Sequence, residues 1–347
     1  MNANGPWRSP VPAVLAVIVG HFAVAHHPAA AQSRSFSYDR LSFLEERLAT
    51  EVGDVTFRLN GLLESPTTVD LDGDEARHSE FLGNFDITAG TQLPNRWRVR
   101  LTYLGQYATQ PLFNGEVAEG YGDNALLSIG GAWGTMLAGN VSGVVREQTR
   151  RLRGLGGHQL VFDDVLGRIG ERSVGYVGRF GPWVMSTVLD EEAGFELGAT
   201  FQRPLGNKDY RLTARYVESV FAPANESVLF DTQAVVVVGE FIYGATLLDL
   251  SLGHEQLSAD ALSADRSYLS SGVRTKLGAV GFFLEGHRSR IEGQDVLSAT
   301  VGLEHDLARG LSATWGVHYA DAVVNIGRVS LLDSRDRQFV FSLLYGF

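Results

Sequence analysis

The sequence predicts an all-β fold, an antiparallel transmembrane β-barrel of about sixteen strands. Apolar and polar residues alternate with a period of two along many short segments, which places them on opposite faces of a strand. The connections between these segments tend to alternate between long and short. Mean hydropathy is −0.01, as expected when lipid-facing and lumen-facing side chains average out. An apolar content of 44% excludes intrinsic disorder.

Residues 1–31 have the pattern of a secretory signal peptide. Arg8 precedes an apolar run from Val11 to Ala25, and Ala29-Ala30-Ala31 has the small-residue form of a cleavage site. The apolar run is shorter than the roughly 20 residues of a spanning helix, although an uncleaved N-terminal anchor is the alternative. We therefore expect an exported chain. The absence of cysteine excludes disulfides, thiolate metal sites and cysteine nucleophiles.

Residues 32–53 precede the first predicted strand. Asp39 can cap a short helix that presents Leu41, Leu44 and Leu48 on one side. We expect a periplasmic segment that rests on the barrel mouth, and the alternative is a plug that enters the lumen. The barrel is then expected over residues 54–347.

The strands are predicted from the alternation. In 339–347 and, except at Gly105, in 97–107, aromatic and aliphatic side chains occupy every second position. Ser342 and Gly346 lie between them in the first segment, and Arg98, Arg100, Thr102 and Gln106 in the second. The predicted strands are 54–63, 79–92, 97–107, 124–132, 134–140, 173–179, 182–189, 194–203, 209–217, 231–242, 245–254, 267–277, 279–288, 295–306, 311–320 and 337–347.

The loop lengths favour a membrane barrel over a soluble one. Long connections are predicted at 64–78, 108–123, 141–172, 218–230, 255–266 and 321–336, with two brief ones on the same side. The opposite strand ends are joined by tight turns, an asymmetry typical of outer-membrane barrels. A soluble all-β binding protein of the periplasm would also alternate and is the competing interpretation.

Three stretches of the sequence resemble the Gram-negative trimeric porins. Residues 338–347, which end in Tyr345-Gly-Phe347, resemble the signal read by the barrel-assembly machinery. Residues 127–140 and 301–321 resemble two porin hairpins. The resemblance implies a sixteen-stranded homotrimer embedded in outer-membrane lipid and lipopolysaccharide. It also implies that the third loop, residues 141–172, folds inward and narrows a pore.

The pore lining follows from the alternation and the resemblance together. The alternation turns Arg58, Arg98 and Arg100 toward the lumen, because an arginine at the bilayer midplane costs about 2–4 kcal/mol. By resemblance these residues form the constriction wall, and acidic residues of the third loop face them. The charged loop residues assigned to the constriction are Arg146, Arg150, Arg151, Arg153, Asp163 and Asp164.

These assignments lead to a functional hypothesis. The third loop carries six arginines against four acidic residues, so we hypothesise a passive diffusion pore for small hydrophilic solutes that leans toward anions. The alternative is a substrate-selective channel for anionic or carboxylate solutes. A competing interpretation pairs the loop arginines with local carboxylates. The formal charge of −11 argues against nucleic acid as a partner.

Asp70, Asp72 and Asp74 alternate around a glycine on a predicted external loop. Carboxylates in such a pattern can bind Ca²⁺, but the distal bidentate glutamate of an EF-hand is missing. A solvated acidic loop is therefore favoured over a structural Ca²⁺ site, and no other cofactor is implied.

An enzymatic role is disfavoured. A lipid hydrolase on a barrel exterior needs a serine nucleophile and a histidine base. His254 and His305 face outward in the predicted register, yet the sequence holds no G-x-S-x-G and no H-E-x-x-H motif.

Overall fold

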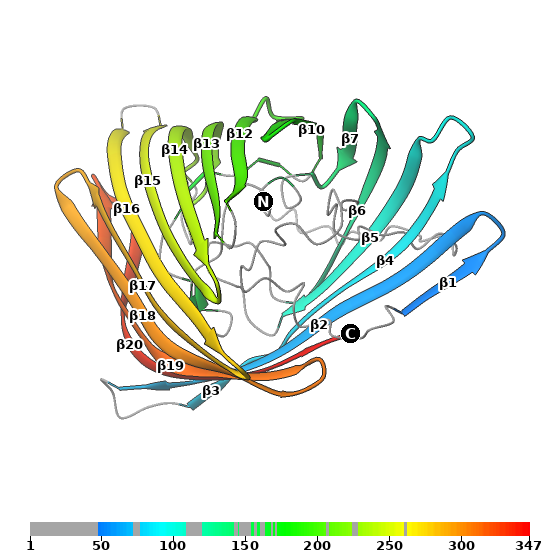
Figure 1. The fold of residues 1–347 in the computed structure, drawn as a ribbon. Helices are drawn as coiled ribbons and strands as arrows, with labels where there is room; N and C mark the ends of the chain where they lie inside the picture. Colours follow the sequence, from blue (N-terminus) through cyan, green and yellow to red (C-terminus); the bar gives the residue numbers. More distant parts are fainter. Residues whose placement is uncertain are drawn as a thin grey trace, which may run out of the picture.

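The protein is all-β in the part of the chain that the structure describes, which confirms the predicted fold class (Figure 1). The structure is a computed structural model. It describes residues 48–71, 77–108, 120–141, 145, 154–155, 158–159, 164–167, 169–170, 172–205, 208–223, 228–259 and 262–347. The predicted signal peptide and the capped helix beginning at Asp39 fall in residues 1–47, outside the described residues, except for Leu48.

Sixteen antiparallel strands close a ring. Two of the 18 strands in the main sheet, β1 and β3, pair only with β2, and the rest form the barrel, in which β20 returns to pair with β2. The barrel strands are β2 (Val55–Asp70), β4 (Leu82–Gln92), β5 (Arg98–Ala108), β6 (Gly120–Gly131), β7 (Gly134–Gly139), β10 (Ser173–Phe180), β11 (Trp183–Asp190), β12 (Phe195–Leu205), β13 (Lys208–Phe221), β14 (Phe230–Tyr243), β15 (Thr246–Ala259), β16 (Leu262–Leu277), β17 (Val280–Ile291), β18 (Gln294–Ala308), β19 (Leu311–Ile326) and β20 (Val329–Gly346).

Two short strands extend the ladder of β2. β3 (Arg77–Ser79) pairs with the end of β2 and continues the line of β4. β1 (Leu48–Val52) pairs with the start of β2 on the edge that β20 occupies further along. Leu48 therefore belongs to a strand and not to the predicted helix. A separate two-stranded sheet consists of β8 (Gly154–Leu155) and β9 (His158–Gln159).

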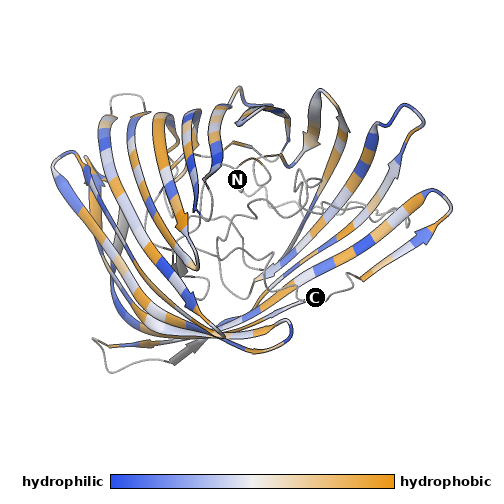
Figure 2. Ribbon diagram, in the orientation of Figure 1, coloured by the Kyte–Doolittle hydropathy of each residue, from blue (hydrophilic) through white to orange (hydrophobic). Residues whose placement is uncertain are grey.

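Hydrophobic and hydrophilic residues alternate along the strands (Figure 2), and the burial pattern places the apolar residues outside and a more polar set inside. On β15, Leu248, Leu250 and Leu252 are 46%, 48% and 51% exposed, whereas Asp249 and Ser251 between them are buried. An apolar exterior around a polar interior is the design of a barrel that spans a membrane. Within the described residues, no helix has the length and apolarity to cross a membrane.

Aromatic side chains collect near one rim of the barrel, which we call the short-turn rim because turns such as 132–133, 181–182 and 244–245 lie there. The rings of Trp97 and Trp133 are 5.9 Å apart, and Trp133 stacks on Tyr176 at 6.2 Å. Trp183 meets Phe201 edge-on at 5.0 Å. Aromatic girdles of this kind mark a membrane–water interface.

The opposite rim, here the long-loop rim, has shorter connections than the sequence predicts. In place of the loops at 255–266 and 321–336, β15 and β16 are separated by two residues, and β19 and β20 meet at Gly327 and Arg328. The predicted loop at 64–78 is likewise shortened, because β2 runs on to Asp70. Toward this rim, past the outward-facing apolar side chains, the outward positions of the strands are polar, as at Gln256 and Asp265. Hydrophobic alternation therefore stops although the backbone ladder continues.

Candidate functional site

Arginine–carboxylate pairs line the inner face of β12 to β17. Arg211 and Arg266 stand directly opposite Glu240 and Glu255 in the strand register, whereas Arg215 and Arg274 are diagonal to Glu196 and Glu285 on the same face. The guanidinium of Arg215 is 2.9 Å from Glu196, and that of Arg266 is 2.9 Å from Glu255. Arg211–Glu240 and Arg274–Glu285 are 2.5 and 2.6 Å apart.

Asp164, from the third loop, lies between two of these arginines. Nη1 of Arg215 donates to both carboxylate oxygens of Asp164 at 3.0 Å. Nη1 of Arg266 donates to the backbone carbonyl of Asp164 at 2.7 Å. Both arginine side chains are fully covered, with 0% of their surface exposed. The loop is thus bonded to β13 and β16 at the same residue.

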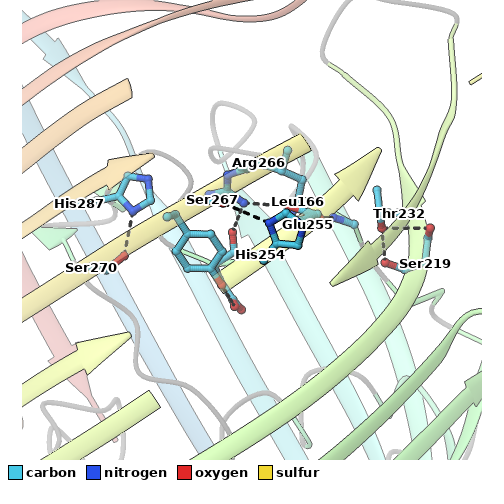
Figure 3. Close-up of polar contacts among 12 residues, drawn as sticks. Leu166, Ser219, Thr232, His254, Glu255, Arg266, Ser267, Ser270 and His287 are labelled. Atoms are coloured by element: carbon cyan, nitrogen blue, oxygen red, sulfur yellow. Dashed lines mark hydrogen bonds and ion pairs between the residues drawn. The ribbon is translucent and has the colours of Figure 1, made fainter. Parts of the chain in front are cut away.

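Glu255 of β15 provides the second attachment (Figure 3). Its carboxylate accepts the backbone N–H groups of Leu166 at 2.9 Å and Gly167 at 3.3 Å, and also the guanidinium of Arg266 at 2.9 Å. A buried carboxylate is costly unless it is paired and hydrogen-bonded. The loop backbone and Arg266 together meet that requirement.

Gly167 brings the loop backbone unusually close to the wall. A Cβ atom at this position would collide with the hydroxyl groups of Thr232 and Ser219, which are hydrogen-bonded to each other at 3.0 Å (Figure 3). A glycine is needed because only a residue without a side chain permits this approach. Further along, the N–H of Gly170 donates to Asp190 at 2.6 Å.

Apolar residues of the same loop fill the space against the wall. Val141, Val145 and Ile169 join a buried cluster with residues of β6, β7, β10, β11, β13 and β14. Leu166 packs into a second cluster that includes Phe230 and Leu257. The inward fold predicted for residues 141–172 is therefore confirmed for the part of this loop that the structure describes.

The predicted wall residues Arg58, Arg98 and Arg100 lie on the inner face of β2 and β5. Their register places them on the same face as Thr88 and Thr102, which are buried inside the barrel. Arg58 and Arg98 have no ion-pair partner among the described residues. β2 and β5 stand across the barrel from β13 to β16 (Figure 1), so Asp164 is bound to the opposite wall.

Several predicted site residues cannot be placed in the same way. Arg146, Arg150, Arg151, Arg153 and Asp163 of the loop lie outside the described residues, as do Asp72 and Asp74.

Asp70 and the residues of the predicted assembly signal are described. Asp70 is exposed at the end of β2, and no group of three metal-ligating side chains occurs among the described residues. Tyr345 faces outward, and Phe347 exchanges backbone hydrogen bonds with Gly61 at 2.9 and 3.0 Å. The roles assigned to these residues, Ca²⁺ binding included, stay predictions.

The attachment of the loop by Glu255 and Arg266 was not predicted from the sequence. The sequence signal for it is a glutamate and an arginine eleven positions apart at its two ends, in a range, 255–266, that the alternation predicts as a loop and the structure shows as paired strands. The sequence likewise does not predict the contact between His254 and Ser267. They meet on the outer face, with His254 Nδ1 3.1 Å from the Ser267 hydroxyl.

No protein-family model matches the sequence, and no curated protein matches it. Solved structures do resemble the fold. OmpT of Vibrio cholerae, an outer-membrane protein in a trimer form, aligns with a TM-score of 0.65 at 12% identity over 84% of this chain and 99% of that one. The anion-selective porin of Comamonas acidovorans gives 0.61 at 10% identity over 84% and 100%. A mutant of the Rhodopseudomonas blastica porin gives 0.57 at 13% identity over 84% and 100%.

The chain therefore has a porin-like fold: a closed sixteen-stranded barrel with an apolar exterior, a charged interior and a third loop bonded inside. Barrels of this design occur in outer membranes, which confirms the predicted outer-membrane location.

Proposed function

We propose that this protein is a porin, a water-filled channel through which small hydrophilic solutes and ions diffuse passively across the outer membrane. The observation that carries the proposal is the third-loop segment fixed inside a closed, charged barrel by Asp164 and by the amides of Leu166 and Gly167. In this proposal, the loop held against one wall narrows the lumen and leaves a passage beside it. No catalytic role is proposed for any residue.

We further propose that the channel prefers anions. Arginines on the inner face of β13 and β16 are neutralised by carboxylates, whereas Arg58 and Arg98 on the opposite wall have no such partner among the described residues. Unpaired guanidinium groups along a pore attract anions and repel cations. The structural neighbour from Comamonas acidovorans is itself described as anion-selective.

Reversal potentials across a KCl gradient test both proposals. We expect the wild-type protein in planar bilayers to pass Cl⁻ in preference to K⁺, and R58Q/R98Q to lose most of that preference. R203Q, which changes an outward-facing arginine, is the matched control and is expected to behave as wild type. Cation selectivity of the wild-type channel would overturn the anion preference alone. A folded protein that does not conduct would overturn the porin assignment.

A substrate-selective channel for carboxylate solutes is the second candidate. It is favoured by the same free guanidinium groups, since arginine binds carboxylates with two parallel hydrogen bonds. Candidate carboxylates are added during current recording. Block that saturates at low solute concentration supports the selective channel, and its absence supports the general pore.

We also propose that the protein assembles as a homotrimer, inserted through the barrel-assembly machinery and surrounded by lipopolysaccharide. Support comes from the trimeric form of the Vibrio cholerae structure and from the terminal Phe347, whose backbone completes the seam with β2. Cross-linking of the detergent-extracted protein checks this, and a monomer at all concentrations would contradict it.

A further inference from the structure

We infer that the inner wall of β2, β4 and β5 binds solutes that carry one carboxylate and several hydroxyl groups, the chemistry of a sugar acid. The part of this wall nearer the short-turn rim, which we call the arginine end, carries Arg58, Arg98 and Arg100. The next part toward the long-loop rim, which we call the amide end, carries Asn60, Asn84 and Asp86. The inference rests on the proposed channel function and names the solute class that the channel favours.

This wall stays open to the lumen. Gln92, Arg98 and Gln106 are exposed, and the inward-facing residues between them are partly exposed, namely Arg58, Asn60, Asn84, Asp86 and Arg100. The inner face of β15 to β18 is covered instead, with Glu255, Ser270 and Ser298 at 0% exposure. A solute that crosses the barrel therefore meets the side chains of β2, β4 and β5.

The arginine end provides guanidinium groups for a carboxylate. Arg58 and Arg98 have no ion-pair partner among the described residues. The stem of Arg100 lies over β4, because a Cβ at Gly90 would be 3.0 Å from its Cγ. On the described part of this face, the carboxylates close to the arginine end are Glu51 and Asp54, both exposed at the short-turn rim. Three guanidinium groups against two solvated carboxylates leave this end positive, and arginine binds a carboxylate through two parallel hydrogen bonds.

The amide end provides both donors and acceptors for hydroxyl groups. Asn60 and Asp86 stand opposite each other in the register, and Asn60 Nδ2 donates to Asp86 Oδ1 at 2.7 Å. Asn84 follows on β4, and its buried Oδ1 accepts no hydrogen bond from the described residues. A carboxylate has about four acceptor sites and a side-chain amide about two donors, so the Asn60–Asp86 pair has capacity for further hydrogen bonds.

The spacing of the two ends fits a single solute. Asn60 follows Arg58 by two residues on a strand that rises about 3.3 Å per residue, so the two side chains share a face about 7 Å apart. An extended chain of several carbon atoms covers this distance. A carboxylate held by Arg58 therefore places the hydroxyl groups of its own chain beside Asn60 and Asp86. A fatty carboxylate would place methylene groups there and displace water without replacing its hydrogen bonds.

An amino acid is the nearest competing solute, because Asp86 also attracts an ammonium group. The surroundings of Asp86 favour hydroxyls, since Asn60 and Asn84 offer amides, and hydroxyls both donate and accept hydrogen bonds. The next carboxylate on this face of β2, Glu64, is buried and accepts a hydrogen bond from Ser342 at 3.0 Å. It therefore adds no open negative charge that would hold an ammonium group.

Solute block of the current in planar bilayers tests the inference. The probes are gluconate, hexanoate, glucitol and 6-aminohexanoate, which have chains of equal length. We expect gluconate to block wild-type channels at about tenfold lower concentration than hexanoate, which carries the same charge but no hydroxyls. N60L/D86L is expected to abolish this difference, and R58Q/R98Q to weaken block by both acids. Q202L changes an inner-face amide of β12 and is the matched control, expected to behave as wild type.

Several outcomes would overturn the site. They are equal block by gluconate and hexanoate in wild type, an unchanged ratio between them in N60L/D86L, or an equal loss in Q202L. Block by glucitol as strong as that by gluconate would indicate a neutral sugar site. Stronger block by 6-aminohexanoate than by gluconate would indicate a site for zwitterions.

Two further measurements keep the test decisive. If N60L/D86L does not fold, N84L replaces it and is expected to weaken gluconate block about threefold while hexanoate block is unchanged. If the folded wild-type protein does not conduct, the porin proposal fails, and calorimetric titration of the detergent-purified protein with gluconate and hexanoate still tests the site. A conducting channel that does not distinguish the two acids overturns this inference alone.

Discussion

Replacing Glu255 with alanine is expected to detach the third loop from the barrel wall. The carboxylate of Glu255 binds the amides of Leu166 and Gly167 and the guanidinium of Arg266. In E255A the two amides lose their acceptor and Arg266 loses its counter-charge. The attachments that remain are Asp164, through Arg215 and through its carbonyl bond to Arg266, the hydrogen bond from Gly170 to Asp190, and the apolar packing of the loop against the wall.

The magnitude follows from these contacts. Hydrogen bonds to a charged group contribute about 1.5–3 kcal/mol each, so the two amide bonds are together worth at least about 3 kcal/mol. Removing one partner of a buried ion pair costs about 3–5 kcal/mol. Lumenal water can hydrate Arg266 once the loop moves, which favours the lower figure. At 1.4 kcal/mol per tenfold change, a loss of about 3 kcal/mol raises the detached population roughly a hundredfold.

Single-channel recording in planar bilayers measures the effect. E255A is expected to show larger open-state conductance and more frequent current fluctuations, with a lower temperature for heat-induced unfolding in detergent. The control is E304Q, also on the inner face, where Glu304 is 4.0 Å from Lys276 and the lysine keeps Asp306 at 2.6 Å. E304Q is expected to match wild type in both measurements.

A double variant, E255M/R266M, separates loop attachment from barrel stability. It removes both buried charges, so the unfolding temperature is expected to recover toward wild type while the current fluctuations persist. The reasoning is refuted if E255A conducts with wild-type amplitude and noise, or if the double variant restores both properties together.

Three other changes give separate expectations. L250R places a charge on the lipid-facing side of β15 and is expected to lower the free energy of unfolding by about 2–4 kcal/mol, measured by urea titration in lipid vesicles. Q256R, on the same face but outside the apolar part of the strand, is expected to cost less than about 1 kcal/mol. Equal losses would contradict the assigned outer face. G167V introduces a side chain where Ser219 and Thr232 leave no space, so noisy channels with an intact barrel are expected in bilayer recordings. F347A removes a ring that packs over Gly61 and is expected to lower the free energy of unfolding by about 1–2 kcal/mol. The loss is measured as a lower temperature at which the protein changes from folded to unfolded migration on gels. An unchanged temperature would contradict a stabilising role for Phe347 where β20 meets β2.

The sequence was sufficient to predict the barrel because lipid imposes a strict period of two. Positions such as Leu250 must be apolar and their neighbours face the lumen, so sixteen strands could be counted from alternation alone. The strand ends at 255–266 and 321–336 could not be predicted, because outside the membrane both faces of a strand tolerate polar residues. The strands continue there, but their sequence shows no alternation of apolar and polar residues.

The candidate site was predictable only in part. That Arg58 and Arg98 point inward follows from their position within a strand. The partners of Asp164 depend on where the loop is attached to the wall, and that is decided by contacts between residues 51 and 102 positions apart. Spacing along the chain carries no information about such pairs.

The meeting of β1 and Phe347 on one edge of β2 limits where a fusion can be attached. Phe347 is hydrogen-bonded to Gly61, and Leu48 pairs with Leu59, so β1 continues the line of β20 after a gap of one position. A peptide fused to Phe347 cannot run on as a strand without displacing β1 from the edge of β2. An affinity tag or fluorescent fusion is therefore better inserted in a connection at the long-loop rim, where it competes with no backbone pairing.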